Sequence, residues 1–297
     1  MKSSYFIQSF KKEKSLRVII SKSSGYCNGV KKAIKTLDKA IEVYGGGSFV
    51  FTLGDIIHNP KVIENYKNKG VLALNKIDGL NKDNNLVIRS HGVSPEIINK
   101  LNEKGVNILN ATCPFVLKVH EKARELSKKG YFLILIGNKY HPEIMGIKGN
   151  IQGENFKIIN SPQDAESIEP QKKIAIISQT TQTRENFLLI AKKITEKMQN
   201  EVIIFNTICK STELRQKEAS FLSNEVDIMI VIGGKNSANT IHIAEISKNN
   251  LAQTYHIENE DELDMQWFKG KKLAGIMSGA STPIEDVLIV KEIINKI

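Results

Sequence analysis

The chain has 297 residues, of which 41% are hydrophobic and 25% charged, an ordinary composition for a globular protein able to bury a sizeable core. Its apolar runs, such as residues 131–136, are far too short to span a bilayer, and residues 1–15 lack the apolar centre of a secretion signal. We therefore expect a cytoplasmic protein with no membrane partner.

The formal net charge is +10, which raises the question of nucleic-acid binding. Only five of the 42 basic residues are arginine, the lysines are scattered, and no basic stretch is interleaved with aromatic residues. This pattern predicts no nucleic-acid partner. A positive surface suits an anionic substrate or an acidic redox partner equally well.

In chain order, each of the three cysteines follows a short apolar strand and precedes a helix. Residues 18–20 lead to Cys27 and a helical run at 30–43, residues 108–110 lead to Cys113, and residues 202–205 lead to Cys209. A thiol at a helix N-terminus faces unpaired amides and the positive end of the dipole, which stabilise a thiolate. Three inert buried thiols are the alternative, but the shared setting argues against it. An odd number of cysteines also argues against a disulfide scaffold.

The chain repeats itself with a period of about a third of its length. A strand ends at Gly54, Gly137 or Gly233 after each cysteine, and four residues later stand His58, His141 and Ser237. A later strand in each third ends in a second polar loop, at residues 89–92, 178–181 and 278–281. Strands alternating with helices predict parallel sheets, whose functional loops gather at the carboxyl ends of the strands.

We therefore predict an α/β fold of three lobes with mostly parallel sheets, related by a pseudo-threefold axis that brings the three cysteines to one point. The predicted lobes are residues 16–107 with Cys27, 108–200 with Cys113 and 201–297 with Cys209, after a tail at 1–15. Three independent domains in a row would leave each cysteine alone. No linker rich in Pro, Gly or Ser separates the thirds, which favours one body.

Three converging thiolates suit either zinc with a histidine or an iron–sulfur cluster with one open iron. The cysteines are too far apart in sequence for the close pairs of structural zinc sites. Glu143, after Pro142 at a helix start, could donate a proton, although an acid at a helix start also interacts with the dipole. The polar loops offer donors for a phosphate or diphosphate, or are simply solvated: His58, His91, Ser237, Asn239 and Ser281.

Several motifs in the same order resemble the 4-hydroxy-3-methylbut-2-enyl diphosphate reductase family from about Arg17 onward. They are SGYCNGV from Ser24, HNP from His58, SHGV from Ser90, ATCP around Cys113, HPE from His141, QTT from Gln179, TICKST around Cys209, GGKNSAN from Gly233 and SGAS from Ser278.

The resemblance implies one [4Fe–4S] cluster at the centre of the three lobes, held by Cys27, Cys113 and Cys209. It implies reductive dehydroxylation of an allylic diphosphate to isopentenyl and dimethylallyl diphosphates, with electrons from an external donor such as ferredoxin or flavodoxin. Glu143 matches the group that supplies protons, and His141 and Thr180 match residues beside the substrate hydroxyl. The diphosphate matches are His58, His91, Ser237, Asn239 and Ser281.

One departure concerns the third lobe, where Ala238 stands in place of a serine found in many family members. One hydroxyl donor to the diphosphate is therefore absent. Two alternatives stay open at this point: a quinolinate-synthase-like enzyme, which shares three lobes and three cysteines, and a non-catalytic cluster or metal sensor. The HPE, SHGV and GGKNSAN loops do not resemble those of quinolinate synthases. A sensor would need the thiolates but has no evident use for Glu143 and Thr180.

Overall fold

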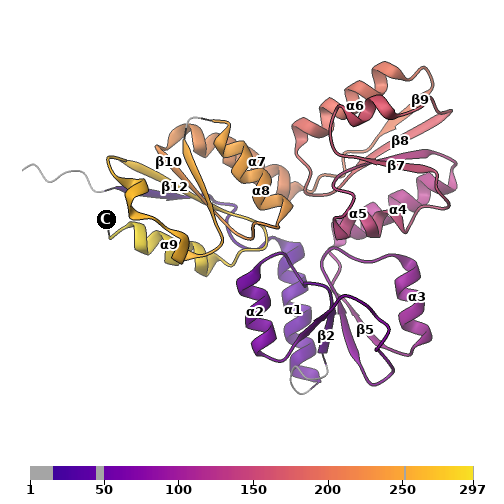
Figure 1. Ribbon diagram of the computed structural model, residues 1–297, viewed down its shortest axis with the longest axis horizontal. Helices are drawn as coiled ribbons and strands as arrows, with labels where there is room; N and C mark the ends of the chain where they lie inside the picture. Colours follow the sequence, from indigo (N-terminus) through magenta and orange to yellow (C-terminus); the bar gives the residue numbers. More distant parts are fainter. Residues whose placement is uncertain (1–15, 45–49, 251, 297) are drawn as a thin grey trace, which may run out of the picture.

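The computed structural model describes residues 16–44, 50–250 and 252–296. They form three lobes grouped around a common centre, each built on a four-stranded sheet whose paired strands are all parallel (Figure 1). Both faces of each sheet carry helices, as parallel sheets require. The predicted α/β fold of three lobes is confirmed.

Lobe one contains the sheet β3(Leu72–Leu74)-β2(Val50–Leu53)-β4(Asn85–Ile88)-β5(Asn107–Asn110). Helices α1(Asn28–Val43) and α2(Pro60–Asn68) cover one face through a core that includes Leu37 and Tyr66. Helix α3(Pro95–Glu103) covers the other face through Leu101. The central strand β4 is buried along its length, because both of its faces are covered.

Lobe two contains the sheet β7(Phe156–Ile159)-β6(Phe132–Ile136)-β8(Lys173–Ser178)-β9(Glu201–Ile204). Helices α4(Pro114–Lys128) and α5(Pro142–Lys148) pack on one face, and α6(Arg184–Lys197) packs on the other with the short turn η2(Asp164–Ser167). Proline occupies the first position of both α4 and α5, where its missing N–H costs nothing.

Lobe three contains the sheet β1(Arg17–Ile20)-β12(Leu273–Ser278)-β10(Ile228–Ile232)-β11(Gln253–Ile257). Helices α7(Lys210–Glu225) and α8(Ala238–Lys248) pack on one face. Helix α9(Ile284–Ile294) and the short turns η3(Glu260–Glu262) and η4(Met265–Phe268) cover the other face. The sheet thus combines the first described strand of the chain with the last three.

The predicted lobe boundaries are wrong in one respect, the strand before each cysteine. β5 pairs with β4 and so closes lobe one, β9 closes lobe two, and β1 closes lobe three. The helix after each cysteine packs in the next lobe. The physical reason is that these are edge strands, half exposed, from which the chain leaves one sheet and crosses to another. Each cysteine therefore lies on a crossing between lobes. The predicted tail at 1–15 falls outside the described residues.

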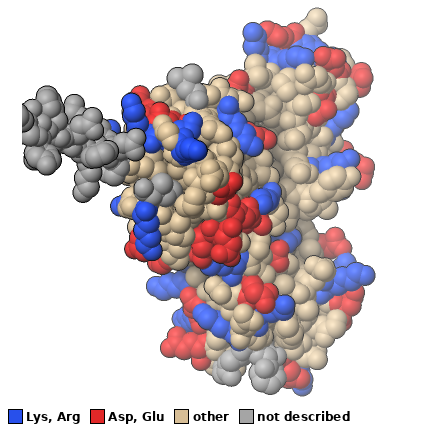
Figure 2. All heavy atoms as spheres, turned by 60° about the vertical axis from the view of Figure 1, so that its left-hand side comes forward, with Lys and Arg blue, Asp and Glu red and all other residues tan. Residues whose placement is uncertain are grey.

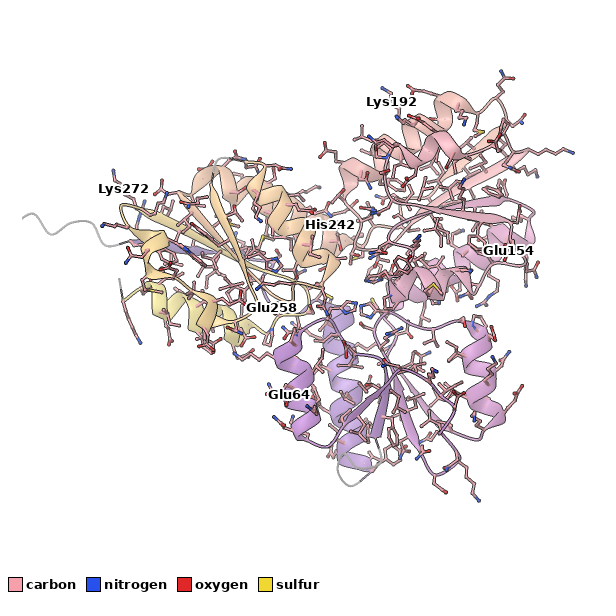
Figure 3. The ribbon with its side chains drawn as sticks, viewed as in Figure 1. Glu64, Glu154, Lys192, His242, Glu258 and Lys272 are labelled. Atoms are coloured by element: carbon pink, nitrogen blue, oxygen red, sulfur yellow. The ribbon has the colours of Figure 1, made fainter. Side chains whose placement is uncertain are left out.

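Charged side chains lie mainly on the outside of the lobes. Figure 2 shows Lys and Arg interspersed with Asp and Glu over the face that it presents, with one larger acidic group. Glu64, Glu154 and Lys192 point outward from their lobes, whereas His242 lies where lobe three meets lobe two (Figure 3). Among the described helices, none combines the length and apolar character needed to cross a membrane.

Candidate active site

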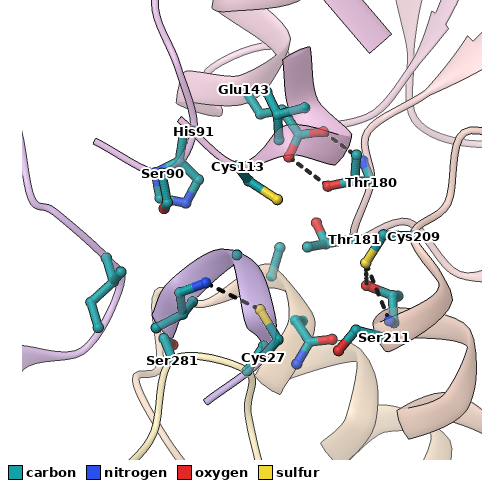
Figure 4. Close-up of a pocket in the computed structure, with 18 of the residues that line it drawn as sticks. Cys27, Ser90, His91, Cys113, Glu143, Thr180, Thr181, Cys209, Ser211 and Ser281 are labelled. Atoms are coloured by element: carbon teal, nitrogen blue, oxygen red, sulfur yellow. Dashed lines mark hydrogen bonds between the residues drawn. The ribbon is translucent and has the colours of Figure 1, made fainter. Parts of the chain in front are cut away.

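A cavity of about 100 Å³ lies where the three lobes meet (Figure 4). The loops at the carboxyl ends of the strands form its wall, as expected for parallel sheets. The structure brings every predicted site residue to this one cavity: Cys27, His58, His91, Cys113, His141, Glu143, Thr180, Cys209, Ser237, Asn239 and Ser281.

The three cysteines each begin a helix, and Figure 4 shows their sulfur atoms turned toward the same space. The Cys27 sulfur accepts a hydrogen bond from Val30 N at 3.4 Å, and the Cys209 sulfur accepts one from Thr212 N at 3.3 Å. Burial raises the pKa of the Cys113 and Cys209 thiols. The amides of Phe115 and Val116 beside Cys113, and the hydroxyl and amide of Thr212 beside Cys209, only partly offset it. The predicted helix N-termini are present, but metal binding is needed to keep these buried thiols ionised.

The first turn of α1 approaches the cysteines very closely. A Cβ atom on Gly29 would lie 2.5 Å from Cys113 Sγ and 3.8 Å from Cys27 Sγ, which leaves no room for any other residue type. Three thiols in one cavity, with a glycine that lets backbone approach them, form a donor set that fits an iron–sulfur cluster.

Glu143 enters the cavity wall from the first turn of α5 and is only 1% exposed. Its two carboxyl oxygens accept hydrogen bonds from Thr180 N at 2.6 Å and Thr180 Oγ1 at 2.9 Å. Burial raises the pKa of Glu143 to about 7, although the Thr180 hydrogen bonds act in the opposite direction. A carboxyl group with such a pKa is partly protonated at neutral pH and can act as a general acid.

Three imidazoles form a second group in the cavity. The His58 and His91 rings stack with centroids 4.3 Å apart, and the His141 ring lies edge-on at 5.4 Å and 5.3 Å from them. Burial lowers the pKa of all three, that of His141 to about 3, so they are neutral at pH 7. Both ring nitrogens of His58 and Nδ1 of His91 have no hydrogen-bond partner among the described residues.

The three imidazoles could bind either a metal ion or a diphosphate, and their geometry distinguishes the two. One nitrogen from each ring lies within 4.8 Å of the others, a spacing that a metal ion would have to shorten, since zinc sits about 2.0–2.1 Å from histidine nitrogen. Unpartnered N–H groups side by side are suited to the several oxygens of a diphosphate.

Lobe three supplies further neutral donors. Ser237 caps α8, and both polar side-chain atoms of the buried Asn239 have no partner in the described part of the chain. Ser281 Oγ donates to the carbonyl of His58 at 2.9 Å, which links lobe three to lobe one. No Lys or Arg occurs among the described residues that line the cavity, so an anion there would depend on these donors and on the N-terminus of α8.

Sequence reasoning missed several lining residues: Phe115, Thr181, Ser211 and Thr212. Ser211 and Thr212 lie in the first turn of α7, directly after Cys209, and Thr212 Oγ1 is 3.1 Å from the Cys209 sulfur. Their position in the turn that follows a cysteine was the available signal. Thr181 lies in the QTT motif that the sequence had already singled out.

Comparisons with known proteins agree with this geometry. The family model described as LytB protein matches residues 18–297. The 4-hydroxy-3-methylbut-2-enyl diphosphate reductase of Aquifex aeolicus is 41% identical over 268 residues, covering 90% of this chain and 91% of that protein. The protein of the same name from Caldanaerobacter subterraneus is 39% identical over 284 residues, covering 95% of this chain and 96% of that protein.

Two solved structures are also similar. One is (E)-4-hydroxy-3-methyl-but-2-enyl diphosphate reductase, described as the terminal enzyme of the non-mevalonate pathway, with 40% identity, a TM-score of 0.69 and coverage of 94% of this chain and 99% of that chain. The other is the E-1-hydroxy-2-methyl-but-2-enyl-4-diphosphate reductase of Plasmodium falciparum, with 25% identity, a TM-score of 0.88 and coverage of 94% and 88%. The structure with the higher identity superposes less closely.

Proposed function

Because the chain belongs to the LytB protein family, we propose that it is a 4-hydroxy-3-methylbut-2-enyl diphosphate reductase of isoprenoid biosynthesis. The reaction takes two electrons and two protons, releases the substrate hydroxyl as water, and yields isopentenyl and dimethylallyl diphosphates. The observation that carries the proposal is a single cavity that holds three thiols, a buried carboxyl group with a raised pKa and a set of unpartnered neutral donors.

The thiols of Cys27, Cys113 and Cys209 would hold one [4Fe–4S] cluster. When bound, the cluster supplies the electrons and an iron without a protein ligand, which can act as a Lewis acid. An external electron donor of the ferredoxin or flavodoxin class would reduce the cluster again after each turnover. The close approach of Gly29 to two of the sulfurs supports this assignment, because inorganic sulfides need the same space near backbone amides.

Glu143 supplies protons, and Thr180 positions it. The carboxyl group is held by the Thr180 N–H and hydroxyl, so its remaining freedom is small, and it lines the cavity. Thr180 and His141 lie beside the carboxyl group and would contact the substrate hydroxyl. A proton delivered at this place assists departure of the hydroxyl as water.

The diphosphate would be held by groups from two lobes. His58 and His91 contribute ring nitrogens from lobe one, and lobe three contributes Ser237, Asn239 and Ser281 at the start of α8 and in the loop after β12. Ala238 stands at the first position of α8 and offers no hydroxyl, so this chain relies on one donor fewer. A hydrogen bond to a charged group contributes about 1.5–3 kcal/mol. Its absence lowers the affinity for the diphosphate without altering the reaction.

Anaerobic reconstitution tests the proposal directly. We expect about four irons per chain, a paramagnetic signal on reduction that changes when 4-hydroxy-3-methylbut-2-enyl diphosphate is added, and formation of both five-carbon diphosphates with a chemical reductant. Stoichiometric zinc without iron would contradict the proposal and favour a metal-binding sensor.

A further inference from the structure

Arg215 lies on α7, behind the cavity wall and between two of the cysteine loops. Its side chain is buried, with 3% of the residue exposed. The Nη2 group donates to the carbonyl of Gly25, two residues before Cys27, at 2.6 Å, and Nη1 donates to the hydroxyl of Ser211, two residues after Cys209. One guanidinium therefore ties the Cys27 loop to the Cys209 helix.

The positive charge of Arg215 has no direct counter-ion in the described part of the chain, where no carboxylate oxygen lies within 4.0 Å of its nitrogens. Glu218, one turn later on α7, accepts hydrogen bonds from Ser23 N at 2.9 Å and Ser23 Oγ at 2.8 Å instead. The Arg215 Nε atom is buried without a partner among the described residues. Burying a cation is costly unless an anion lies nearby.

The candidates for that anion are the cysteines that stand two residues from the groups Arg215 bonds, Cys27 after Gly25 and Cys209 before Ser211. Burial lowers the pKa of Arg215, and the charges of Cys27, Cys209 and Glu218 act in the opposite direction. Two of these three groups are thiols, which carry negative charge once they bind a metal. Metal loading therefore adds two negative partners for Arg215 to the charge of Glu218.

We propose that Arg215 is the counter-charge of the cysteine-bound cluster and raises its reduction potential. This inference rests on the proposed function. The step concerned is the uptake of one electron from an external donor of the iron–sulfur or flavin class; no proton moves and no bond is made or broken. The added electron would make the cluster and its thiolates one unit more negative, and a buried cation bonded to both the Cys27 loop and the Cys209 helix would stabilise that state. Arg215 does not reach the cavity surface, so it acts on the potential and on loop position rather than on substrate.

The experiment is a redox titration of the reconstituted full chain, followed by electron paramagnetic resonance. In Arg215→Gln we expect the equilibrium constant for electron uptake to fall about tenfold or more, a midpoint shift of about −59 mV or beyond for a one-electron couple. Arg215→Lys keeps the charge and should stay close to the wild-type potential. Arg184→Gln is the matched control, because that arginine is exposed and paired with Glu213 at 3.5 Å. The reduction potential of the cluster should not change in this variant.

A fully loaded Arg215→Gln variant with the wild-type potential would overturn the inference, and so would an equal shift in Arg184→Gln. If Arg215→Gln takes up no cluster, the lysine variant decides: full iron content at the wild-type potential supports the counter-charge, whereas loss of iron in both variants shows a packing role only. Absence of a cluster in the wild-type protein would instead refute the proposed function, so the two failures are distinct.

Discussion

At the scale of single residues, the environment of Glu143 sets up acid chemistry at neutral pH. A carboxyl group that is 1% exposed strongly prefers its neutral form, and two hydrogen bonds from Thr180 restore part of the stability of the anion. The balance places its pKa at about 7, between those of an ordinary carboxyl group and a fully isolated one. The group can therefore both hold and release a proton in each turnover.

Replacing Glu143 with glutamine keeps the shape of the side chain and removes the proton. We expect turnover to fall about 10²- to 10⁴-fold, the usual contribution of a general acid, with iron content and the resting spectrum unchanged. Steady-state kinetics beside iron analysis would check this. A variant that retains full turnover would assign the proton to another group, and would favour a sensor over an enzyme.

The raised pKa of Glu143 also makes stability depend on pH. In the unfolded chain the carboxyl group ionises near 4.5, whereas in the folded, metal-free protein it ionises near 7. The folded state therefore binds more protons between these values, so the contribution of Glu143 is fully present below about pH 4.5 and is lost as pH rises to about 7. We expect the free energy of unfolding of Glu143→Gln, followed in urea, to fall less steeply over this window than that of the wild type; parallel curves would contradict the assignment.

The predicted site residues share one property, a position in a loop that recurs in each third of the chain. The recurrence identified His58, His141 and Ser237 because each stands at the same offset from a strand end. Arg215 stands in the middle of a helix and recurs nowhere, so only its contact with Gly25 reveals it. The raised pKa of Glu143 likewise depends on its burial in the folded protein, which no local pattern encodes.

At the scale of secondary-structure elements, the N-termini of α1, α4 and α7 define the thiol site. Each helix begins at a cysteine, and the backbone of α1 comes within contact distance of the cysteine that begins α4. The spacing between helices, more than any single side chain, fixes where the sulfurs lie.

Gly29→Ala tests this spacing. The added methyl group would overlap Cys113 Sγ, so we expect the reconstituted variant to lose most of its iron while its helix content stays at the wild-type level. Gly79→Ala is the matched control, because a Cβ atom there would have nothing within 4 Å. Full iron content in Gly29→Ala would show that the two helices can move apart freely.

The elements themselves follow closely from the sequence, but the pairing of strands does not. Apolar runs bounded by glycine and polar residues mark β2, β6 and β10, and the structure places strands there. The run at 18–20 is equally clear as a strand, yet nothing local indicates that Arg17 pairs with Leu273. Parallel pairing between distant segments is decided by the packing of whole lobes.

At the scale of the whole molecule, polar contacts join the lobes around the cavity. Lobe three contacts lobe two through His242 Nδ1 and the carbonyl of Thr181, 2.8 Å apart, and contacts lobe one through Lys61 Nζ and Asp286 Oδ1, also 2.8 Å apart. Such contacts can adjust when a ligand bridges the lobes. A different arrangement of the lobes would also explain why the solved structure with 40% identity superposes on this chain with a TM-score of 0.69, below the 0.88 of the one with 25% identity.

The proposed diphosphate donors belong to different lobes, His58 and His91 to lobe one and Ser237 and Asn239 to lobe three. We therefore expect substrate to draw the lobes together and reduce the radius of gyration of the cluster-loaded protein in small-angle scattering. Inorganic diphosphate serves as the probe that isolates the contribution of the anion. An unchanged scattering curve at saturating substrate would show that the lobes are already closed.

The pairing of β1 with β12 has a consequence for how the protein is made. β1 is synthesised before the other described strands, and its partner β12 is synthesised after all of them. Lobes one and two can therefore fold before lobe three, whose sheet is incomplete until β12 has been made. Cys27 follows β1 directly and reaches Cys209 only when that lobe closes. The three thiols therefore come together only after β12 has been synthesised, so metal insertion has to follow the synthesis of all three lobes.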